Sequence, residues 1–202
     1  MDNFSIKCLD GKVRDFCWKK SIGIFIDCQR DFISGVLGSG EAKKAFKNVE
    51  KLAEQNFLRK MATLDIHYDD YYETLEGKYL PVDHCKIYSR GCEMEGDLYD
   101  LAIKEKWQLF EKETFGSFGL ARWLKEYRFK DNLDCVIVSG FCTDICVISN
   151  VLMIKSVLEN VPIIVVEDAC AGSSDGMHKK ALEVMESCHV DVVNMQDLGL
   201  RA

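Results

Sequence analysis

Three side chains of different chemistry follow predicted strands in this 202-residue sequence. Asp27 comes directly after the apolar run IGIFI, Lys112 ends the run WQLFEK, and Cys146 lies about one turn into the helix predicted after Cys135–Ser139. A thiol attacks a carbonyl as a thiolate, which a neighbouring cation and a helix N-terminus both favour. An aspartate beside it can accept the thiol proton and return it to a leaving amine. These residue types indicate nucleophilic catalysis on a carbonyl compound.

The elements that must position these residues alternate between strands and helices. Four short apolar runs, rich in β-branched residues, predict strands at Ile22–Ile26, Met61–Ile66, Cys135–Ser139 and Pro162–Val166, and weaker candidates are Cys85–Ser89 and Val190–Asn194. Trp107–Glu111 can form a further short strand that ends at Lys112. Apolar residues at three- and four-residue spacing predict helices at Glu41–Arg59, Phe118–Phe129, Thr143–Glu159 and Asp175–Cys188. Such alternation predicts an α/β fold of three αβα layers with a mostly parallel central sheet. In such a sheet, ligands bind beyond the carboxyl ends of the strands.

The length fits one domain with a substantial core, so we expect residues 1–202 to form a single domain. Residues 1–20 precede the first core strand and read as an N-terminal arm. The longest irregular stretch is Tyr68–Gly96, and long loops in compact domains are usually functional.

Composition excludes several classes of function. The net charge of −7 and the absence of a basic run argue against nucleic-acid binding. No apolar stretch is long enough to span a membrane, and the first residues lack the apolar core of a signal peptide, so we expect a soluble, cytoplasmic protein. The ten cysteines contain no C-x-x-C pair, which argues against a structural zinc knuckle. Most of them read as small buried hydrophobes.

Four stretches together resemble the isochorismatase-like cysteine hydrolases, in the branch related to nicotinamidases. They are IDCQRDF, FEKETFGSF, GFCTDICV and VVEDACAG, spread over residues 22–188. The resemblance implies the isochorismatase-like hydrolase fold, with Asp27 as general acid and base, Lys112 as the cation and Cys146 as the nucleophile. Taken singly, each residue is more often structural, because an aspartate after a strand is usually a turn residue and a buried cysteine usually packs in the core.

The resemblance also implies a cis peptide bond between Phe141 and Cys142. Its expected purpose is to direct the backbone N–H groups of Cys142 and Cys146 at one oxyanion. Thr143 suits the N-cap position of the helix that follows, which would leave the N–H groups of the first turn free.

A second group of residues has the types that bind metals. Asp65 and His67, two positions apart, share one side of an extended strand end, and His84 follows in the long irregular stretch. From the residues alone, polar loop histidines without a metal are the more common reading. The resemblance implies a divalent metal, zinc, held by Asp65, His67 and His84, with Glu73 where many nicotinamidases have histidine. Two histidines with carboxylates also suit manganese or iron(II).

The resemblance makes a small-molecule amide the expected substrate, with nicotinamide the leading candidate, and implies possible self-association into a homo-oligomer. Phe32 matches an aromatic residue of the family's pocket and can stack on a ring. The stretches LPVD and KIYSRGCE depart from the family pattern and indicate an altered pocket, in which Tyr68, Tyr71 and Tyr72 could form a substitute wall. The alternatives are hydrolysis of another small amide or ureide, a non-catalytic binding homologue, and a thiol redox protein using Cys142 and Cys146.

Overall fold

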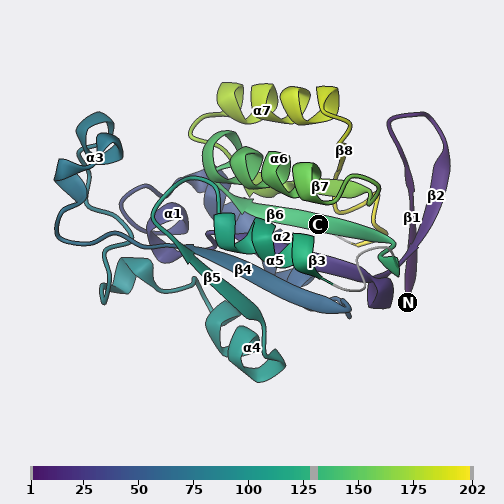
Figure 1. Cartoon of the computed structure of the whole chain (residues 1–202), viewed down its shortest axis with the longest axis horizontal. Coiled ribbons are helices and arrows are strands. Elements are labelled where there is room, and N and C mark those ends of the chain that lie inside the picture. Colours follow the sequence, from purple (N-terminus) through teal and green to yellow (C-terminus); the bar gives the residue numbers. More distant parts are fainter. Residues whose placement is uncertain (1, 128–131, 201–202) are drawn as a thin grey trace.

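The centre of the protein is a sheet of six parallel strands, in the order β5-β4-β3-β6-β7-β8. The computed structural model describes residues 2–127 and 132–200. The strands are β3 (Ser21–Ile26), β4 (Arg59–Asp65), β5 (Gln108–Lys112), β6 (Cys135–Phe141), β7 (Ile163–Ala171) and β8 (Asp191–Val193), as Figure 1 shows. The predicted three-layer fold is confirmed.

Helices cover both faces of the sheet. On one face lies α2 (Gly40–Ala53), and on the other lie α5 (Phe118–Glu126), α6 (Ile148–Val157) and α7 (Asp175–Ser187). Side chains alternate between the faces of a strand. Accordingly Ile24 of β3 packs in the cluster with α5, α6 and α7, whereas the next residue, Phe25, packs in the cluster with α2. Strands buried on both faces are apolar throughout, which is why the sequence pattern identified them.

Two further parts of the chain lie at opposite ends of the molecule (Figure 1). At one end, the antiparallel strands β1 (Asn3–Lys7) and β2 (Val13–Cys17) form a hairpin within the predicted arm. At the other end, α3 (Leu75–Tyr79) lies within the predicted irregular stretch. The short helices α1 (Arg30–Ile33) and α4 (Leu98–Glu105) complete the chain, with 3-10 turns at Trp18–Lys20, Tyr71–Glu73 and Arg90–Cys92. Among the described residues, no helix has the length and apolar character needed to cross a membrane.

Two sequence predictions about elements are wrong. The segment Cys85–Ser89 is not a strand, because Cys85 and Tyr88 adopt positive φ angles of 44° and 64° that interrupt an extended backbone. Helix α2 ends at Ala53, six residues before the predicted end at Arg59, which begins β4 instead. The predicted end of the helix at Phe129 lies outside the described residues.

Candidate active site

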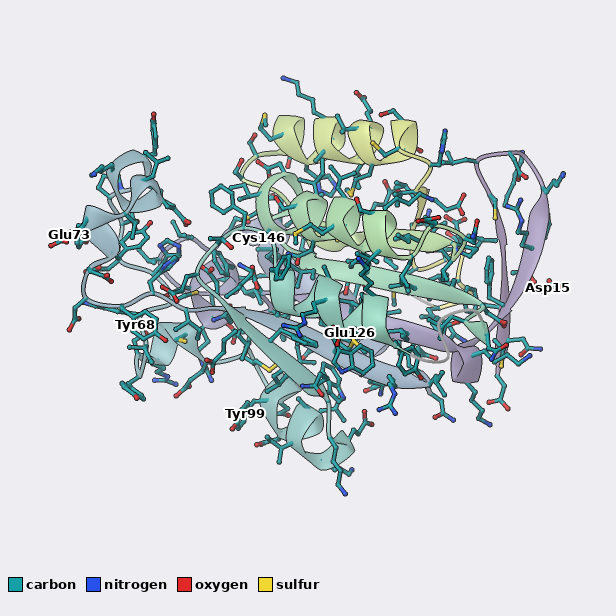
Figure 2. All side chains as sticks on the ribbon, viewed as in Figure 1. Asp15, Tyr68, Glu73, Tyr99, Glu126 and Cys146 are labelled. Atoms are coloured by element: carbon teal, nitrogen blue, oxygen red, sulfur yellow. The ribbon has the colours of Figure 1, made fainter. Side chains whose placement is uncertain are left out.

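The three residues predicted from strand ends meet in one buried cluster. Asp27 follows β3, Lys112 ends β5, and Cys146 lies in the π-helical turn Thr143–Val147 that leads into α6. The Lys112 Nζ atom lies 2.7 Å from Asp27 Oδ2 and 3.6 Å from Cys146 Sγ, to which it donates a hydrogen bond. All three side chains are buried, and Cys146 retains 4% exposure. Figure 2 labels Cys146 beside the central sheet, where α6 begins.

The parallel register brings these residues to the same edge of the sheet. In the register, Ile26 of β3 lies between Thr63 of β4 and Gly140 of β6, and Asp65 pairs with Lys112 of β5. The carboxyl ends of four neighbouring strands therefore share one edge, where ligands bind in such sheets. Gly140 has a φ of +132°, and a Cβ there would lie 2.0 Å from the Ile26 carbonyl oxygen, so this close approach of β6 to β3 needs a glycine.

Burial dominates the electrostatics of the cluster and raises the pKa of both the carboxyl group and the thiol. Burial raises the pKa of Asp27 although Lys112 opposes it, and burial together with the Asp27 charge raises the pKa of Cys146 well above its ordinary value. The thiol is therefore neutral at rest, in contrast to the preformed thiolate that a cation and a helix N-terminus would favour. Burial alone would lower the pKa of Lys112, but Asp27, Cys146 and Asp65 raise it, so the ammonium stays charged.

The two oxygens of Asp27 differ in their contacts. Oδ1 accepts a 2.6 Å hydrogen bond from the Thr63 hydroxyl. Oδ2 has the ion contact with Lys112, but within the described ranges it accepts no hydrogen bond of good geometry. That oxygen can therefore accept the proton of Cys146, and a raised pKa makes Asp27 a better match for a thiol.

The segment before Cys146 has the predicted cis peptide bond between Phe141 and Cys142. The Cys142 amide donates no hydrogen bond in the part of the chain that the structure describes, so it is open to a substrate oxygen. The prediction of Thr143 as N-cap is wrong, because Cys142 holds that position. The buried Thr143 hydroxyl is instead 2.8 Å from His178 Nδ1 of α7.

The predicted metal-binding residues also converge. Ligand atoms of Asp65, His67 and His84 all lie within 4.8 Å of one another, and the three side chains are buried. His67 Nε2 has no hydrogen-bond partner of good geometry among the described residues, although it lies 2.9 Å from Asp65 Oδ2. His84 Nδ1 lies 2.8 Å from the Val82 carbonyl, which fixes its N–H there and leaves Nε2 with a free lone pair. This donor set fits a divalent metal such as zinc.

The fourth predicted ligand, Glu73, needs correction. Its side chain is exposed in the 3-10 turn Tyr71–Glu73, and Figure 2 shows it at the outer edge of the molecule. The carboxylate that approaches is Glu76, whose Oε1 lies 3.7 Å from His67 Nε2 and 3.8 Å from His84 Nε2. Thr74 caps α3 by accepting a hydrogen bond from the Gly77 amide, and Glu76 stands in the first helical turn that this cap begins.

Aromatic side chains surround the histidines. Phe32, predicted to contact a substrate ring, is buried and has its ring centroid 5.7 Å from that of His84 in an edge-on arrangement. Of the three tyrosines considered as a pocket wall, Tyr71 is buried and packs on His67 at 4.4 Å. Tyr68 and Tyr72 are 40% and 48% exposed. Tyr71 therefore packs against the rings of His67 and His84, with centroid distances of 4.4 and 5.3 Å.

Three buried polar residues at the site were missed in the sequence. Thr63 bonds Asp27, and Gln29 bonds the backbone of Asp65. The Asn150 side chain donates a 2.8 Å hydrogen bond to the Cys146 carbonyl and accepts one from the Ser117 backbone N–H. It therefore connects the loop before α5 to the turn that carries Cys146. The sequence positions of two of them could have indicated a role at the site. Gln29 stands inside the IDCQRDF stretch, and Thr63 is a polar residue within an otherwise apolar strand.

The chain has recognisable relatives at the level of family and fold. Residues 21–197 match the family described as Isochorismatase domain, whereas comparison with curated proteins gives no match. Among solved structures, the chain is similar to the nicotinamidase PncA of Bacillus subtilis, with 24% identity, 87% of this chain and 99% of that chain covered, and a TM-score of 0.72.

Two further solved structures give similar values. The pyrazinamidase of Pyrococcus horikoshii in complex with zinc is 23% identical, with 87% of this chain and 99% of that chain covered and a TM-score of 0.68. PnC1 of L. infantum in complex with nicotinate is 17% identical, with 92% and 98% covered and a TM-score of 0.73. At these identities, the similarities establish the fold.

Proposed function

The chain belongs to the isochorismatase domain family, and on that premise we propose that it is a cysteine-dependent amidohydrolase that cleaves a small carboxamide. Nicotinamide, cleaved to nicotinate and ammonia, is the leading candidate substrate. Support for this substrate comes from the names of the similar structures, which include a nicotinamidase, a pyrazinamidase and a complex with nicotinate.

The observation that carries the proposal is the contact of Lys112 with both Asp27 and Cys146. A carboxylate that can act as base and acid lies 2.7 Å from the Lys112 ammonium, and a thiol lies 3.6 Å from it. Together with the ammonium, these are the parts that amide cleavage by a thiol needs. Buried charged groups are costly unless they are paired, and groups with shifted pKa values of this kind cluster at functional sites.

In the proposed first half-reaction, Asp27 accepts the thiol proton as Cys146 Sγ attacks the amide carbon. The carbonyl oxygen becomes an oxyanion, and the backbone N–H groups of Cys142 and Cys146 bind it. Asp27 then gives the proton to the departing nitrogen, the C–N bond breaks, and ammonia leaves a thioester on Cys146. Lys112 stays charged and stabilises the sulfur as it becomes anionic.

In the second half-reaction, Asp27 takes a proton from water while the water oxygen attacks the thioester carbon. The C–S bond then breaks, the carboxylic acid leaves, and Asp27 returns the proton to Cys146. The single carboxylate thus serves as base and acid twice in each cycle.

We further propose that Asp65, His67 and His84, with Glu76 nearby, hold a divalent metal, with zinc as the candidate. Imidazole nitrogens and a carboxylate are suitable zinc ligands, and the zinc complex of the Pyrococcus horikoshii pyrazinamidase supports the choice. When bound, the ion supplies a Lewis acid that orients the heteroaromatic end of the substrate. Phe32, beside His84, is the residue proposed to stack on that ring.

Ammonia release from nicotinamide, pyrazinamide and aliphatic amides, measured with zinc-supplemented protein, tests the proposal. We expect Cys146→Ala to abolish ammonia release, because the nucleophile is lost. We also expect mass spectrometry of a short reaction to detect the covalent thioester on the wild-type protein and not on this variant. The matched control is Cys170→Ala, because Cys170 is a buried thiol of β7 with 5% exposure. It should retain activity within about threefold, as expected for a cysteine that only packs.

Folded protein that releases no ammonia from any of these amides would contradict the amidohydrolase proposal and favour the non-catalytic homologue. Release from aliphatic amides or ureides but not from nicotinamide would keep the mechanism and exclude the leading substrate. Activity retained by Cys146→Ala would remove Cys146 from the mechanism.

A further inference from the structure

Gln29 places a fully buried amide side chain against the backbone of Asp65. Its Oε1 atom accepts a 2.7 Å hydrogen bond from the Asp65 N–H, and its Nε2 donates 2.8 Å to the Asp65 carbonyl. The second proton of Nε2 goes to the Cys92 carbonyl at 2.9 Å. The side chain has no exposed surface, and both protons of its Nε2 and one lone pair of its Oε1 are used on these backbone groups, with a further long contact of 3.8 Å from Nε2 to Cys92 Sγ.

The position of Gln29 follows from how the sheet ends. In a parallel sheet, successive residues of a strand bond alternately to the neighbours on either side. The Thr63 carbonyl accepts from the Asp27 N–H on the β3 side, and the Ile66 N–H donates to β5. By this alternation, the backbone N–H and carbonyl of Asp65 should hydrogen-bond on the β3 side. However, β3 ends at Ile26 and the chain turns at Asp27, whose φ is +46°. The amide of Gln29 takes the place of the missing strand.

The residue held in this way serves two groups of side chains at once. Asp65 Oδ1 lies 3.0 Å from Lys112 Nζ, while Oδ2 lies 2.9 Å from His67 Nε2 and 3.6 Å from His84 Nε2. One carboxylate thus links the ammonium of the catalytic cluster to the histidine pair. A shift of the Asp65 backbone would move both oxygens together, so the two groups depend on the same support.

Gln29 is itself firmly fixed. Its N–H donates to the Asp27 carbonyl at 2.8 Å, its carbonyl accepts from Phe32 at the start of α1, and its backbone forms an isolated bridge with Met94. The support for Gln29 therefore comes from the end of β3 and from the last residues of the irregular stretch Tyr68–Gly96, and not from β4 alone.

We propose that Gln29 is a positioning residue that holds Asp65 so that its carboxylate serves Lys112 and the metal ligands together. The metal part rests on the proposed function. The inference predicts that loss of the Gln29 amide weakens metal binding, because supporting hydrogen bonds around a metal typically contribute 10- to 100-fold in affinity.

The test compares Gln29→Met, which keeps the length of the side chain and removes its hydrogen bonds, with the wild-type protein. Zinc affinity is measured by competition with a chromophoric chelator, and amide hydrogen exchange at Asp65 is followed in the metal-free protein. The matched control is Asn48→Leu, since Asn48 is a buried amide that donates to the Asp168 carbonyl at 2.9 Å, away from the site.

For Gln29→Met we expect zinc binding that is 10- to 100-fold weaker and faster exchange at Asp65. For Asn48→Leu we expect zinc affinity within about threefold of the wild type, even where its melting temperature falls, because general loss of stability does not move a metal ligand. Zinc affinity of Gln29→Met within threefold of the wild type, or unchanged exchange at Asp65, would overturn the inference.

If Gln29→Met does not fold, Gln29→Asn takes its place, because its side chain is one methylene shorter and its amide cannot reach the Asp65 backbone. Wild-type zinc affinity of that variant would refute the inference. If the wild-type protein itself binds no zinc, the proposed metal site is wrong. Amide hydrogen exchange at Asp65 in the metal-free protein then tests by itself whether Gln29 positions Asp65.

Discussion

Replacing Lys112 by methionine removes an ammonium that contacts two buried carboxylates, at 2.7 Å from Asp27 and 3.0 Å from Asp65. With an effective dielectric constant of about 20, each contact contributes about 6 kcal/mol of attraction, much of which desolvation offsets. Removing one partner of a buried ion pair leaves the other charge uncompensated and costs about 3–5 kcal/mol. We therefore expect Lys112→Met to lower the free energy of unfolding by about that amount at pH 7.5.

The loss should depend on pH. Burial already raises the pKa of Asp27 while Lys112 opposes it, so loss of Lys112 raises that pKa further above its unfolded value. The folded variant then binds more protons than the unfolded chain, so its stability falls as pH rises through the raised pKa. The deficit relative to the wild type should be smaller at pH 5 than at pH 7.5.

Urea unfolding of metal-free protein under reducing conditions, followed by tryptophan fluorescence, measures the effect at both pH values. The matched control is Lys86→Met, which removes a lysine 3.1 Å from Asp69 in an exposed pair. Exposed pairs contribute at most about 1 kcal/mol. The double variant Asp27→Asn/Lys112→Met should recover at least about 1 kcal/mol relative to Lys112→Met, because it carries one uncompensated carboxylate fewer.

A loss of less than about 1 kcal/mol for Lys112→Met, no larger than that of the exposed control, would refute the reasoning. An equal loss at pH 5 and pH 7.5 would also refute it, because it would show that the carboxylates are not what the ammonium stabilises.

Two other predictions concern single contacts. Thr63→Val removes the 2.6 Å hydrogen bond that favours the charged form of Asp27, so the pKa of Asp27 rises and the ascending limb of the pH profile of kcat/KM should move up by about one pH unit. An unmoved limb would show that Asp27 is not the titrating base. Glu76→Gln should weaken zinc binding about 10-fold, because its carboxylate approaches both histidines, whereas the exposed Glu73→Gln should leave zinc binding unchanged. The reverse order in a chelator competition would restore Glu73 as the ligand.

Most of the sheet was predictable because its signal is local. Strands such as Ile22–Ile26 are apolar at every position, which marks a strand buried on both faces. The errors fall where the backbone departs from regular geometry, as at Cys85–Ser89, where residue types that favour strands adopt positive φ angles. Helix α2 was predicted six residues too long, because apolar spacing alone does not mark where a helix ends.

Some features of the functional site could likewise be predicted from the sequence, and others could not. Asp27 and Lys112 at strand ends, with Cys146 about one turn into the next helix, predicted a meeting at one edge of the sheet, because parallel strands end at one edge. The family resemblance then assigned their roles. The choice between Glu73 and Glu76 was not predictable by counting from His67, since it depends on the turn and the short helix that lie between them.

By itself, the sequence determined the alternation of buried strands and helices, and therefore which edge of the sheet carries the reactive residues. Only the tertiary structure decided which carboxylate approaches the histidines and that Gln29 stands in for a missing strand beside Asp65. The reason is physical: burial pattern depends on neighbours along the chain, whereas a hydrogen bond between residues 36 positions apart depends on where both backbones end in space.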